Sequence, residues 1–298
     1  MTRKHILHML TPLRHMSPFD VNMALDAGFD AVIPYTGVSL GEVTGLVQDA
    51  IFSRPPDAGA DTGIFIAGKD ALLALDMLEA ARKAMVPPFR ISVFADPAGS
   101  FTTAAAMVAK VEKAMDTHFQ RSLRGTRMAI FGATGVVGFC AAVIAAREGA
   151  EVTLVGHDGL RRVKDIADAI RSRFEVEVTA ADGSTEAGKR AQLDAAEVIL
   201  SAAKAGVQVI SQAQLQAAGG LLIAADVNAV PPAGVEGLPV NADAEPLKEA
   251  GGVGIGPLAI GNVKYKVESG LFKRMIESTK AVTFDFQDAF SLAREKAR

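Results

Sequence analysis

The chain has 298 residues, of which 49% are hydrophobic, and a formal net charge of −3 at neutral pH. This length suits two domains of ordinary size, and the apolar content is ample for buried cores. The slightly acidic charge, without a dense run of Lys and Arg, argues against a nucleic-acid partner. The single cysteine and the five histidines show no metal-ligand spacing, so we expect neither an internal disulfide nor a metal site.

The segment 1–10 has only a short apolar piece, which His8 interrupts, and it lacks the apolar region and the cleavage site of a signal peptide. No uninterrupted apolar run reaches the length that spans a membrane. We therefore expect a cytoplasmic protein without a membrane partner.

Strand-like and helix-like patterns alternate through the first part of the chain, which predicts a mostly parallel sheet covered by helices. Ser17 is a good helix N-cap, because Pro18 follows it directly and Asp20 comes three residues later. Asp20 is thus either a capping carboxylate or a ligand-binding group. The predicted strands are 5–10, 31–35, 63–67 and 90–95, and the predicted helices are 18–27, 40–52, 71–85 and 103–115.

A glycine-rich turn, Gly132-Ala-Thr-Gly-Val-Val-Gly138, separates an apolar strand pattern from the apolar helix pattern 139–147. It resembles the dinucleotide-binding motif G-x-G-x-x-G, with Gly132 one place early and Ala133 in place of the first glycine. Glycines allow a sharp turn and a close approach of the backbone to a pyrophosphate, and the following helix directs its positive end at that anion. The turn therefore predicts the start of a nucleotide-binding βαβ unit.

The alternation continues after Gly138 and indicates a second doubly wound sheet, a Rossmann domain for NAD or NADP. Its predicted elements are the strands 151–155, 176–179, 198–201 and 221–226 and the helix 163–174. The polar segment 120–126 is a plausible domain boundary. A glycine-rich loop, 251–261, leads into helices 263–276 and 286–296, which we expect to pack back on the first sheet. The predicted domains are 1–122 for the substrate, 123–260 for the nucleotide and 261–298 for the tail helices.

The glycine turn also resembles that of the extended short-chain dehydrogenases. That family has the turn at its N-terminus and needs a Tyr-x-x-x-Lys pair for proton transfer. Here the turn is central, and Tyr35 and Tyr265 are followed four residues later by Ser39 and Ser269. This interpretation therefore fails.

Four further segments are distinctive: Ser17-Pro-Phe-Asp-Val21, Gly99-Ser-Phe-Thr-Thr-Ala-Ala-Ala106, Ala225-Asp-Val-Asn-Ala-Val-Pro-Pro232 and Gly254-Ile-Gly-Pro-Leu-Ala-Ile-Gly-Asn-Val-Lys-Tyr-Lys266. With the glycine turn, they make the chain resemble, nearly end to end, the NAD(P)-dependent methylene-tetrahydromethanopterin dehydrogenases of methylotrophic bacteria. The resemblance implies an α/β fold with an N-terminal αβα substrate domain before the Rossmann domain. It also implies oxidation of a methylene-pterin to a methenyl-pterin in one-carbon transfer from formaldehyde, and a homo-oligomer, either a trimer or a hexamer.

The implied chemistry asks little of the protein. The substrate carbon lies between two nitrogens, so a nitrogen lone pair stabilises the developing cation as hydride leaves, and no proton needs to move. Catalysis then depends on holding the two reacting carbons about 3–3.5 Å apart. The absence of a recognisable His/Asp base or nucleophile triad agrees with this.

The strand at 151–155 ends in a mixed signal for the cofactor. Asp158 could accept a hydrogen bond from a ribose hydroxyl, while His157, Arg161 and Arg162 could contact a 2′-phosphate. Otherwise the two arginines are only a solvated helix start. We predict that both NAD and NADP are used.

Resemblance and position together assign the remaining cofactor contacts. Asn228 either faces the nicotinamide or forms a turn with Asp226 before Pro231. The full predicted cofactor set is Gly132, Thr134, Gly135, Val136, Val137, His157, Asp158, Arg161, Arg162, Ala202, Ala203, Lys204 and Asn228.

On the pterin side, Lys264 is expected to begin the tail helix and either to be solvated or to orient the pterin. A cation there would oppose the developing positive charge, so its role would be orientation and not that of a base. Thr102 and Thr103 follow a strand end and could also be ordinary N-caps. The predicted catalytic residues are Lys264 and Thr102, and the predicted substrate-binding residues are Asp20, Tyr35, Ser100 and Thr103.

Two alternatives stay open. The same chemistry on tetrahydrofolate is not separable by sequence, because the pterin heads are similar and the tails reach solvent. A non-catalytic NAD(P)-binding regulator is the other, and the intact segments 99–106 and 254–266 argue against it.

Overall fold

The computed structural model describes residues 3–248 and 250–297. The chain forms two compact units, Met1–Thr102 with Tyr265–Leu292, and Thr103–Lys264 with Ala293–Arg298. The helices α4 (Ser100–Phe119), α9 (Pro257–Glu277) and α10 (Phe286–Lys296) each contribute residues to both units. This division differs from the limits expected after residues 122 and 260, and those domain limits stay a prediction.

The first unit contains a parallel sheet in the order β12-β4-β3-β1-β2. Apart from the added tail strand β12, this is a doubly wound order that changes direction between β1 and β3. Ligands of such sheets bind at the carboxyl ends of the strands beside that point. The strands are β1 (Ile6–Thr11), β2 (Ala31–Thr36), β3 (Thr62–Ile66), β4 (Ser92–Ala95) and β12 (Thr283–Phe284).

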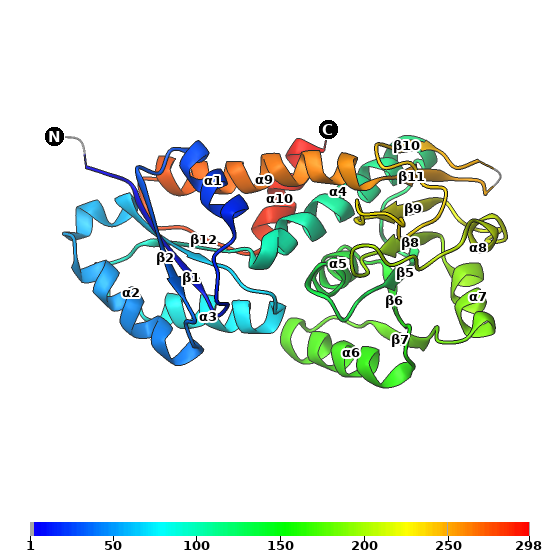
Figure 1. Cartoon of the computed structure of the whole chain (residues 1–298), viewed down its shortest axis with the longest axis horizontal. Helices are drawn as coiled ribbons and strands as arrows, with labels where there is room; N and C mark the ends of the chain where they lie inside the picture. Colours follow the sequence, from blue (N-terminus) through cyan, green and yellow to red (C-terminus); the bar gives the residue numbers. More distant parts are fainter. Residues whose placement is uncertain (1–2, 249, 298) are drawn as a thin grey trace. The chain divides into compact units, whose positions relative to one another are not determined.

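Helices cover both faces of this first sheet (Figure 1), with α1 and α9 on one face and α2 and α3 on the other. Phe272 of α9 packs against Phe65 and Phe94, with ring centroids 5.2 Å apart in both pairs. The tail helix therefore packs on the first sheet, as the sequence predicted. The other helices are α1 (Pro18–Ala27), α2 (Val43–Phe52) and α3 (Ala71–Lys83), with short 3-10 helices at Leu40–Glu42, Pro56–Asp61 and Pro97–Gly99.

The second unit contains a sheet in the order β10-β11-β9-β8-β5-β6-β7. From β7 to β11 all pairs are parallel, and β10 adds an antiparallel edge. Without β10, the order is the 3-2-1-4-5-6 order of a Rossmann fold, which confirms the predicted fold class. The strands are β5 (Arg127–Phe131), β6 (Glu151–Gly156), β7 (Thr179–Asp182), β8 (Val198–Ser201), β9 (Ile223–Asp226), β10 (Asp243–Pro246) and β11 (Val253–Ile255).

Several elements of the second unit were missed or misplaced by the sequence pattern. Helix α7 (Glu186–Ala195) buries only Leu193, so it has almost no apolar periodicity. Helix α8 (Gln212–Gln216) is only five residues long and was not predicted. Strand β7 begins at Thr179, the residue at which the predicted strand 176–179 ends. The remaining helices are α5 (Val136–Arg147) and α6 (Leu160–Phe174). No helix in the described part of the chain is long and apolar enough to cross a membrane.

Candidate functional site

The glycine turn lies between the central strand β5 and helix α5, and its backbone is too tight for side chains at two positions. Gly132 has a φ of +83°, and a Cβ there would lie 2.5 Å from the carbonyl carbon of Ala202. A Cβ on Gly138 would lie 2.6 Å from the carbonyl oxygen of Gly132. Both positions therefore require glycine, one for its left-handed backbone and both for close packing.

Gly135 is the N-cap of α5 and is exposed, and a Cβ there would be in ordinary contact with the carbonyl oxygen of Gly132 at 3.4 Å. Thr134, Val136 and Val137 are partly exposed beside it. The first N–H groups of α5 have no acceptor within the helix and carry its positive dipole end. A tight backbone turn at a helix start, with an exposed glycine as the N-cap, fits the pyrophosphate of a dinucleotide.

The loop after β8 adjoins this turn. Ala202 N donates to the carbonyl oxygen of Phe131 at 2.9 Å, and the backbone of Ala202 and Ala203 packs on Gly132. Ala202 is almost buried, Ala203 is partly buried and Lys204 is exposed. The structure thus brings the segment 132–137 and the segment 202–204 together at the point where the strand order reverses, between β5 and β8.

Asn228 follows β9, and its side chain is committed to the protein itself. Its Oδ1 accepts from Gly206 N at 3.1 Å and Val230 N at 3.0 Å, and its Nδ2 donates to the carbonyl oxygen of Pro232 at 2.8 Å. Only 4% of the residue is exposed. These contacts support the turn-forming interpretation of Asn228.

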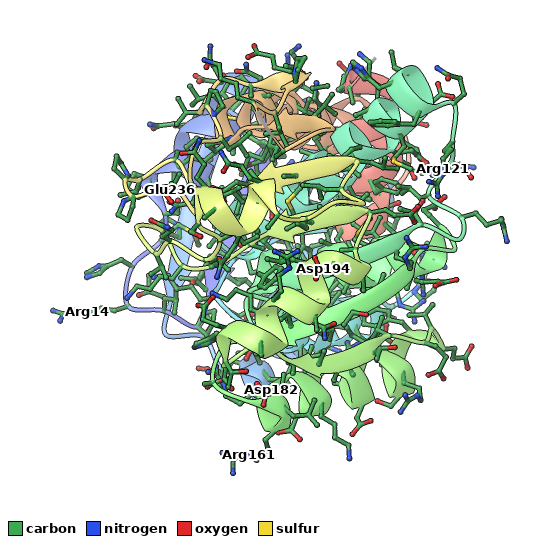
Figure 2. The ribbon with its side chains drawn as sticks, turned by 90° about the vertical axis from the view of Figure 1, so that its right-hand side faces the viewer. Arg14, Arg121, Arg161, Asp182, Asp194 and Glu236 are labelled. Carbon is green, nitrogen blue, oxygen red and sulfur yellow. The ribbon has the colours of Figure 1, made fainter. Side chains whose placement is uncertain are left out.

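The end of β6 carries the charged residues expected to read the adenosine ribose, and all of them are exposed. Asp158 accepts a hydrogen bond from Arg162 Nη1 at 2.9 Å, and His157 Nδ1 lies 3.9 Å from Asp158 Oδ1. The Arg162 hydrogen bond, with the nearby His157, lowers the pKa of Asp158. Arg161 has no acidic partner among the described residues and points away from the ribbon (Figure 2).

Asp182 is a residue that the sequence reasoning missed. It ends β7, and its Cα partner on β6 is Gly156, so it lies at the same sheet edge as the residues after β6. Its carboxylate accepts from Ser184 N at 2.8 Å, and the bonds to Ser184 lower its pKa. Asp182 was not predicted as a site residue because the predicted strand, 176–179, ended before it. The Asp182-Gly183 pair could have indicated that the strand ends at Asp182.

In the first unit, the turn between β4 and α4 is organised by Asp96, which is fully buried. Its Oδ1 accepts from Phe101 N at 2.8 Å and Thr102 N at 3.3 Å, and Thr102 Oγ1 donates to its Oδ2 at 2.6 Å. Ala98 has a φ of +54° in this turn, an unusual conformation for alanine. Helix α4 therefore begins at Ser100, three residues earlier than predicted, and Thr102 and Thr103 lie within its first turn and are not its N-caps.

Tyr35 lies on β2 beside His8, with 3.1 Å between Tyr35 Oη and His8 Nδ1. Both line a hollow of about 200 Å³ under α2, whose other walls include Leu46 and Ile64. Burial lowers the pKa of His8, and the charge of Arg54 adds to the effect. Tyr35 is thus next to the helix-covered face of the sheet.

Asp20 lies in the first turn of α1 and is 2% exposed. Its backbone N donates to Ser17 Oγ at 3.4 Å, which confirms Ser17 as the N-cap.

The sequence analysis assigned no site residues to the loops after β1 and β3. These two loops contact each other at the carboxyl edge of the first sheet. A Cβ on Gly68 would lie 3.5 Å from Pro12 Cδ and 4.0 Å from Pro97 Cβ, so this loop also approaches the turn after β4. Arg14 and Lys69, on the first two of these loops, are exposed.

The prediction that Lys264 begins the tail helix is wrong. Helix α9 begins at Pro257, so Lys264 lies about two turns inside it and is half-buried. The segment 251–261 was predicted to be a loop, but Val253–Ile255 forms strand β11. Pro257 then starts the helix, because proline is favoured in the first turn of a helix.

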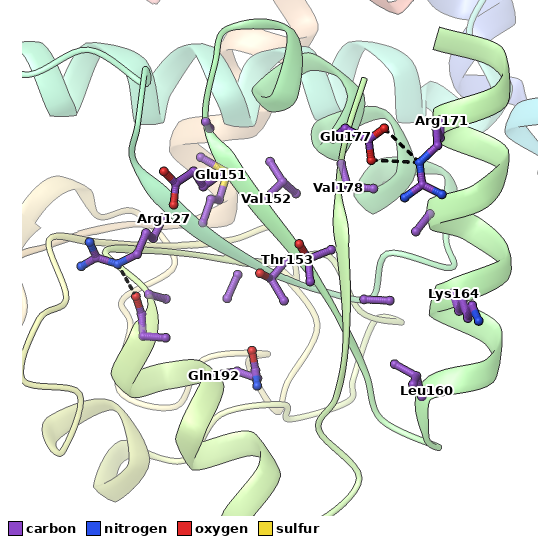
Figure 3. A pocket seen from close by; sticks show the side chains of 18 of the residues that line it. Arg127, Glu151, Val152, Thr153, Leu160, Lys164, Arg171, Glu177, Val178 and Gln192 are labelled. Carbon is purple, nitrogen blue, oxygen red and sulfur yellow. Dashed lines mark hydrogen bonds and ion pairs between the residues drawn. The ribbon is translucent and has the colours of Figure 1, made fainter. Parts of the chain in front are cut away.

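A groove of about 810 Å³ opens on the second sheet between α6 and α7 (Figure 3), with Thr153 on its floor. Arg171 pairs with Glu177 at its rim, with 2.9 Å between Nε and Oε2. Arg127 and Glu151, from the starts of β5 and β6, also line it. The groove therefore lies toward the amino ends of these strands, away from the glycine turn.

No group of three or more His, Cys, Asp and Glu side chains within residues 3–248 and 250–297 is placed to hold a metal ion. The absence of a metal site stays a prediction.

A glycine cradle on a sheet of Rossmann order, which follows another doubly wound sheet in the chain, is typical of two-unit α/β proteins that bind dinucleotides. Shikimate 5-dehydrogenase from Listeria monocytogenes, solved with shikimate and NAD, has this architecture. It superposes with a TM-score of 0.52 over 91% of this chain and 92% of its own, at 13% identity. Likeness at that identity concerns the fold alone.

Sequence comparison identifies the family. The chain is 56% identical, over 99% of both chains, to the NAD(P)-dependent methylenetetrahydromethanopterin dehydrogenase of Methylorubrum extorquens. It is 35% identical to the bifunctional protein MdtA of the same organism, over 94% of this chain and 95% of that protein. The family model for the N-terminal part of methylene-tetrahydromethanopterin dehydrogenase matches residues 18–98. The chain belongs to the family of NAD(P)-dependent methylenetetrahydromethanopterin dehydrogenases.

Proposed function

We propose that this chain oxidises methylene-tetrahydromethanopterin to methenyl-tetrahydromethanopterin, with direct transfer of hydride to NAD(P)+, in one-carbon metabolism of formaldehyde. The observation that carries this proposal is the 56% identity over 99% of the chain to the dehydrogenase of that name. The turn at the start of α5 supports it independently, because Gly132 and Gly138 allow the tight backbone and the exposed Gly135 caps a helix whose N-terminus can bind a pyrophosphate.

Bound NAD(P)+ would supply the hydride acceptor. The backbone of Gly132, Thr134, Gly135, Val136 and Val137 would hold its pyrophosphate, and Ala202, Ala203 and Lys204 would line the next part of the nucleotide. None of these groups needs to exchange a proton, since the reaction requires none.

At the adenosine end, Asp158 would meet a ribose hydroxyl, with Asp182 beside it at the same sheet edge. Arg161 and His157 would serve a 2′-phosphate, because Arg162 is already paired with Asp158. Acidic and basic groups at one place favour the use of both NAD and NADP.

On the pterin side, Asp20, Tyr35, Ser100 and Thr103 stay the proposed substrate contacts. Thr102 would act as a positioning residue, since its hydroxyl hydrogen is given to Asp96 and the pair shapes the turn that ends at Ser100. Lys264 would orient the substrate from α9.

A homo-oligomer, either a trimer or a hexamer, and a cytoplasmic location complete the proposal. Light scattering on micromolar protein would contradict the oligomer if it gave the mass of one chain, 31.1 kDa.

The test is a spectrophotometric assay of cofactor reduction with methylene-tetrahydromethanopterin and, in parallel, methylene-tetrahydrofolate. We expect reduction with the methanopterin substrate and with either nucleotide. Higher kcat/KM with the folate would favour the folate alternative, and reduction with neither substrate would favour the non-catalytic regulator.

A further inference from the structure

Asp226, the last residue of β9, fixes both ends of the loop that follows it. Its Oδ1 accepts from Asn228 N and its Oδ2 from Val235 N, both at 3.1 Å. The residue is 1% exposed, and its Cα partner on β8 is Ser201. Burial raises the pKa of Asp226 although these hydrogen bonds oppose the shift. A buried carboxylate with two backbone donors is a rigid anchor for the segment 227–235.

The Asn228 side chain joins that segment to the loop after β8. Its Oδ1 accepts hydrogen bonds from both Gly206 N and Val230 N, so one amide oxygen links the two loops. A second junction forms where Val209 N and Ile210 N donate to the carbonyl oxygen of Gly234, at 2.8 and 3.0 Å. A Cβ on Gly234 would lie 2.6 Å from Asp226 Oδ1, so the close approach at this junction requires glycine.

The joined loops continue from the glycine cradle. Ala202 and Ala203 pack on Gly132 at one end of the loop after β8, and Asn228 holds Gly206 further along it. The pyrophosphate site and the Asp226 anchor are thus linked by a short run of backbone contacts. On a sheet of this order, the loops that follow the strands beyond the reversal point receive the second half of a dinucleotide.

These loops expose several apolar residues, Ala205, Val207, Ala229, Val230, Pro231 and Pro232. Val230 is 53% exposed and Val207 is 45% exposed. A Cβ on Gly206 would lie 3.9 Å from Val230 Cγ1, so Val230 lies beside the residue that precedes Val207. Val207 and Val230 thus expose apolar surface on the two joined loops, of the kind that a planar ring covers on binding.

We propose that Asp226 and Asn228 are positioning residues for the nicotinamide half of the cofactor, and that they hold the two loops so that Val230 and Val207 contact its ring. The identity of the cofactor rests on the proposed function. The role of the anchor can be tested by binding alone, because ADP-ribose has every part of NAD except the nicotinamide.

The experiment is titration calorimetry of the full chain with NAD and with ADP-ribose. Asn228→Ala should raise the Kd of NAD about tenfold, the equivalent of one or two hydrogen bonds. The Kd of ADP-ribose should change less than about twofold, since the cradle at Gly132 is retained. The matched control is Asn241→Ala, whose side chain is exposed, and it should bind both ligands as the unchanged chain does.

Val230→Ser provides a second variant that does not alter the buried network, because this side chain is 53% exposed. It should also weaken NAD selectively. Equal weakening of NAD and ADP-ribose in either variant, or NAD binding unchanged in Val230→Ser, would overturn the inference. If the variants bind NAD selectively more weakly but the unchanged chain does not oxidise the pterin, the proposed function is contradicted and the inference still holds.

Discussion

Thr102 Oγ1 donates its hydrogen bond to Asp96 Oδ2 at 2.6 Å, and both residues are fully buried. The hydroxyl therefore has no hydrogen left to give a substrate, and it stabilises the turn that carries Ala98 in a left-handed conformation. Thr102→Val removes the hydroxyl and preserves the shape of the side chain. We expect it to lower stability by about 1–2 kcal/mol, because one Asp96 oxygen loses its donor, and to lower kcat/KM for the pterin about tenfold.

Thr102→Ser is the matched control, since it retains the hydroxyl and should recover most of both losses. Urea unfolding and steady-state kinetics measure the two effects. Unchanged unfolding in Thr102→Val would show that the Asp96 bond does not support the turn, and a kcat loss of several orders of magnitude would indicate that the hydroxyl acts on the substrate directly.

Asp158 should set the balance between NAD and NADP. Its carboxylate repels a 2′-phosphate and also occupies Arg162 at 2.9 Å. Asp158→Ala removes the repulsion and releases that arginine, so kcat/KM for NADP should rise relative to NAD by about tenfold. Asp165→Ala, an exposed change on α6, the helix that carries Arg162, should leave the ratio alone. An unaltered ratio in Asp158→Ala would mean that this carboxylate does not face the ribose.

His8 should make the protein less stable in mild acid. Burial lowers its pKa below the ordinary value of 6.5, and Arg54 contributes in the same direction. The unfolded chain then binds a proton more readily than the folded one, so this contribution to stability is present above about pH 6.5 and is lost as the pH falls. His8→Gln should flatten that part of the stability curve.

Chemical denaturation at a series of pH values between neutral and mildly acidic measures this effect. His118→Gln alters an exposed histidine and should leave the curve as it is. If the slope were the same with and without His8, other groups would be responsible for the acid sensitivity.

Lys264→Met tests whether this half-buried lysine fixes the reacting geometry. If it does, kcat should fall by orders of magnitude, about 100-fold or more, while the Kd of NAD stays nearly unchanged. A rise in the pterin KM with kcat retained would instead indicate uniform binding of substrate and transition state. Lys266→Met, two residues further along α9 and exposed, is the control. Normal pterin kinetics in Lys264→Met would place the side chain outside the reaction.

The features that the sequence predicted well are those with a local physical cause. Gly132 and Gly138 are required by a turn that closes within a few residues. Ser17 caps helix α1 through a hydrogen bond from Asp20 N, only three residues further along the chain. The bonds of Asn228 to Val230 and Pro232 are local and form the turn that the sequence allowed. The bond from Gly206 N was not predictable in this way, because Gly206 lies 22 residues away in the sequence and reaches Asn228 only because β8 and β9 are neighbours.

The position of Lys264 was misjudged for a related reason. Gly252, Gly254 and Gly256 made the segment look like an open loop, but their backbones are packed in an ordered region that includes β11. A Cβ on Gly254 would collide with the side chain of Leu247, at 2.8 Å from Cδ2. Glycine marks close packing here, and a single sequence does not separate that from flexibility.

The central claim, direct hydride transfer from the methylene carbon to NAD(P)+, is tested by isotope transfer. Methylene-tetrahydromethanopterin with deuterium at both positions of its methylene carbon should yield reduced nicotinamide that contains one deuterium per turnover, measured by mass spectrometry. The label should stay out of the solvent, because no proton exchange intervenes. Reduced cofactor without deuterium, or no reduced cofactor with either NAD or NADP, would contradict the account.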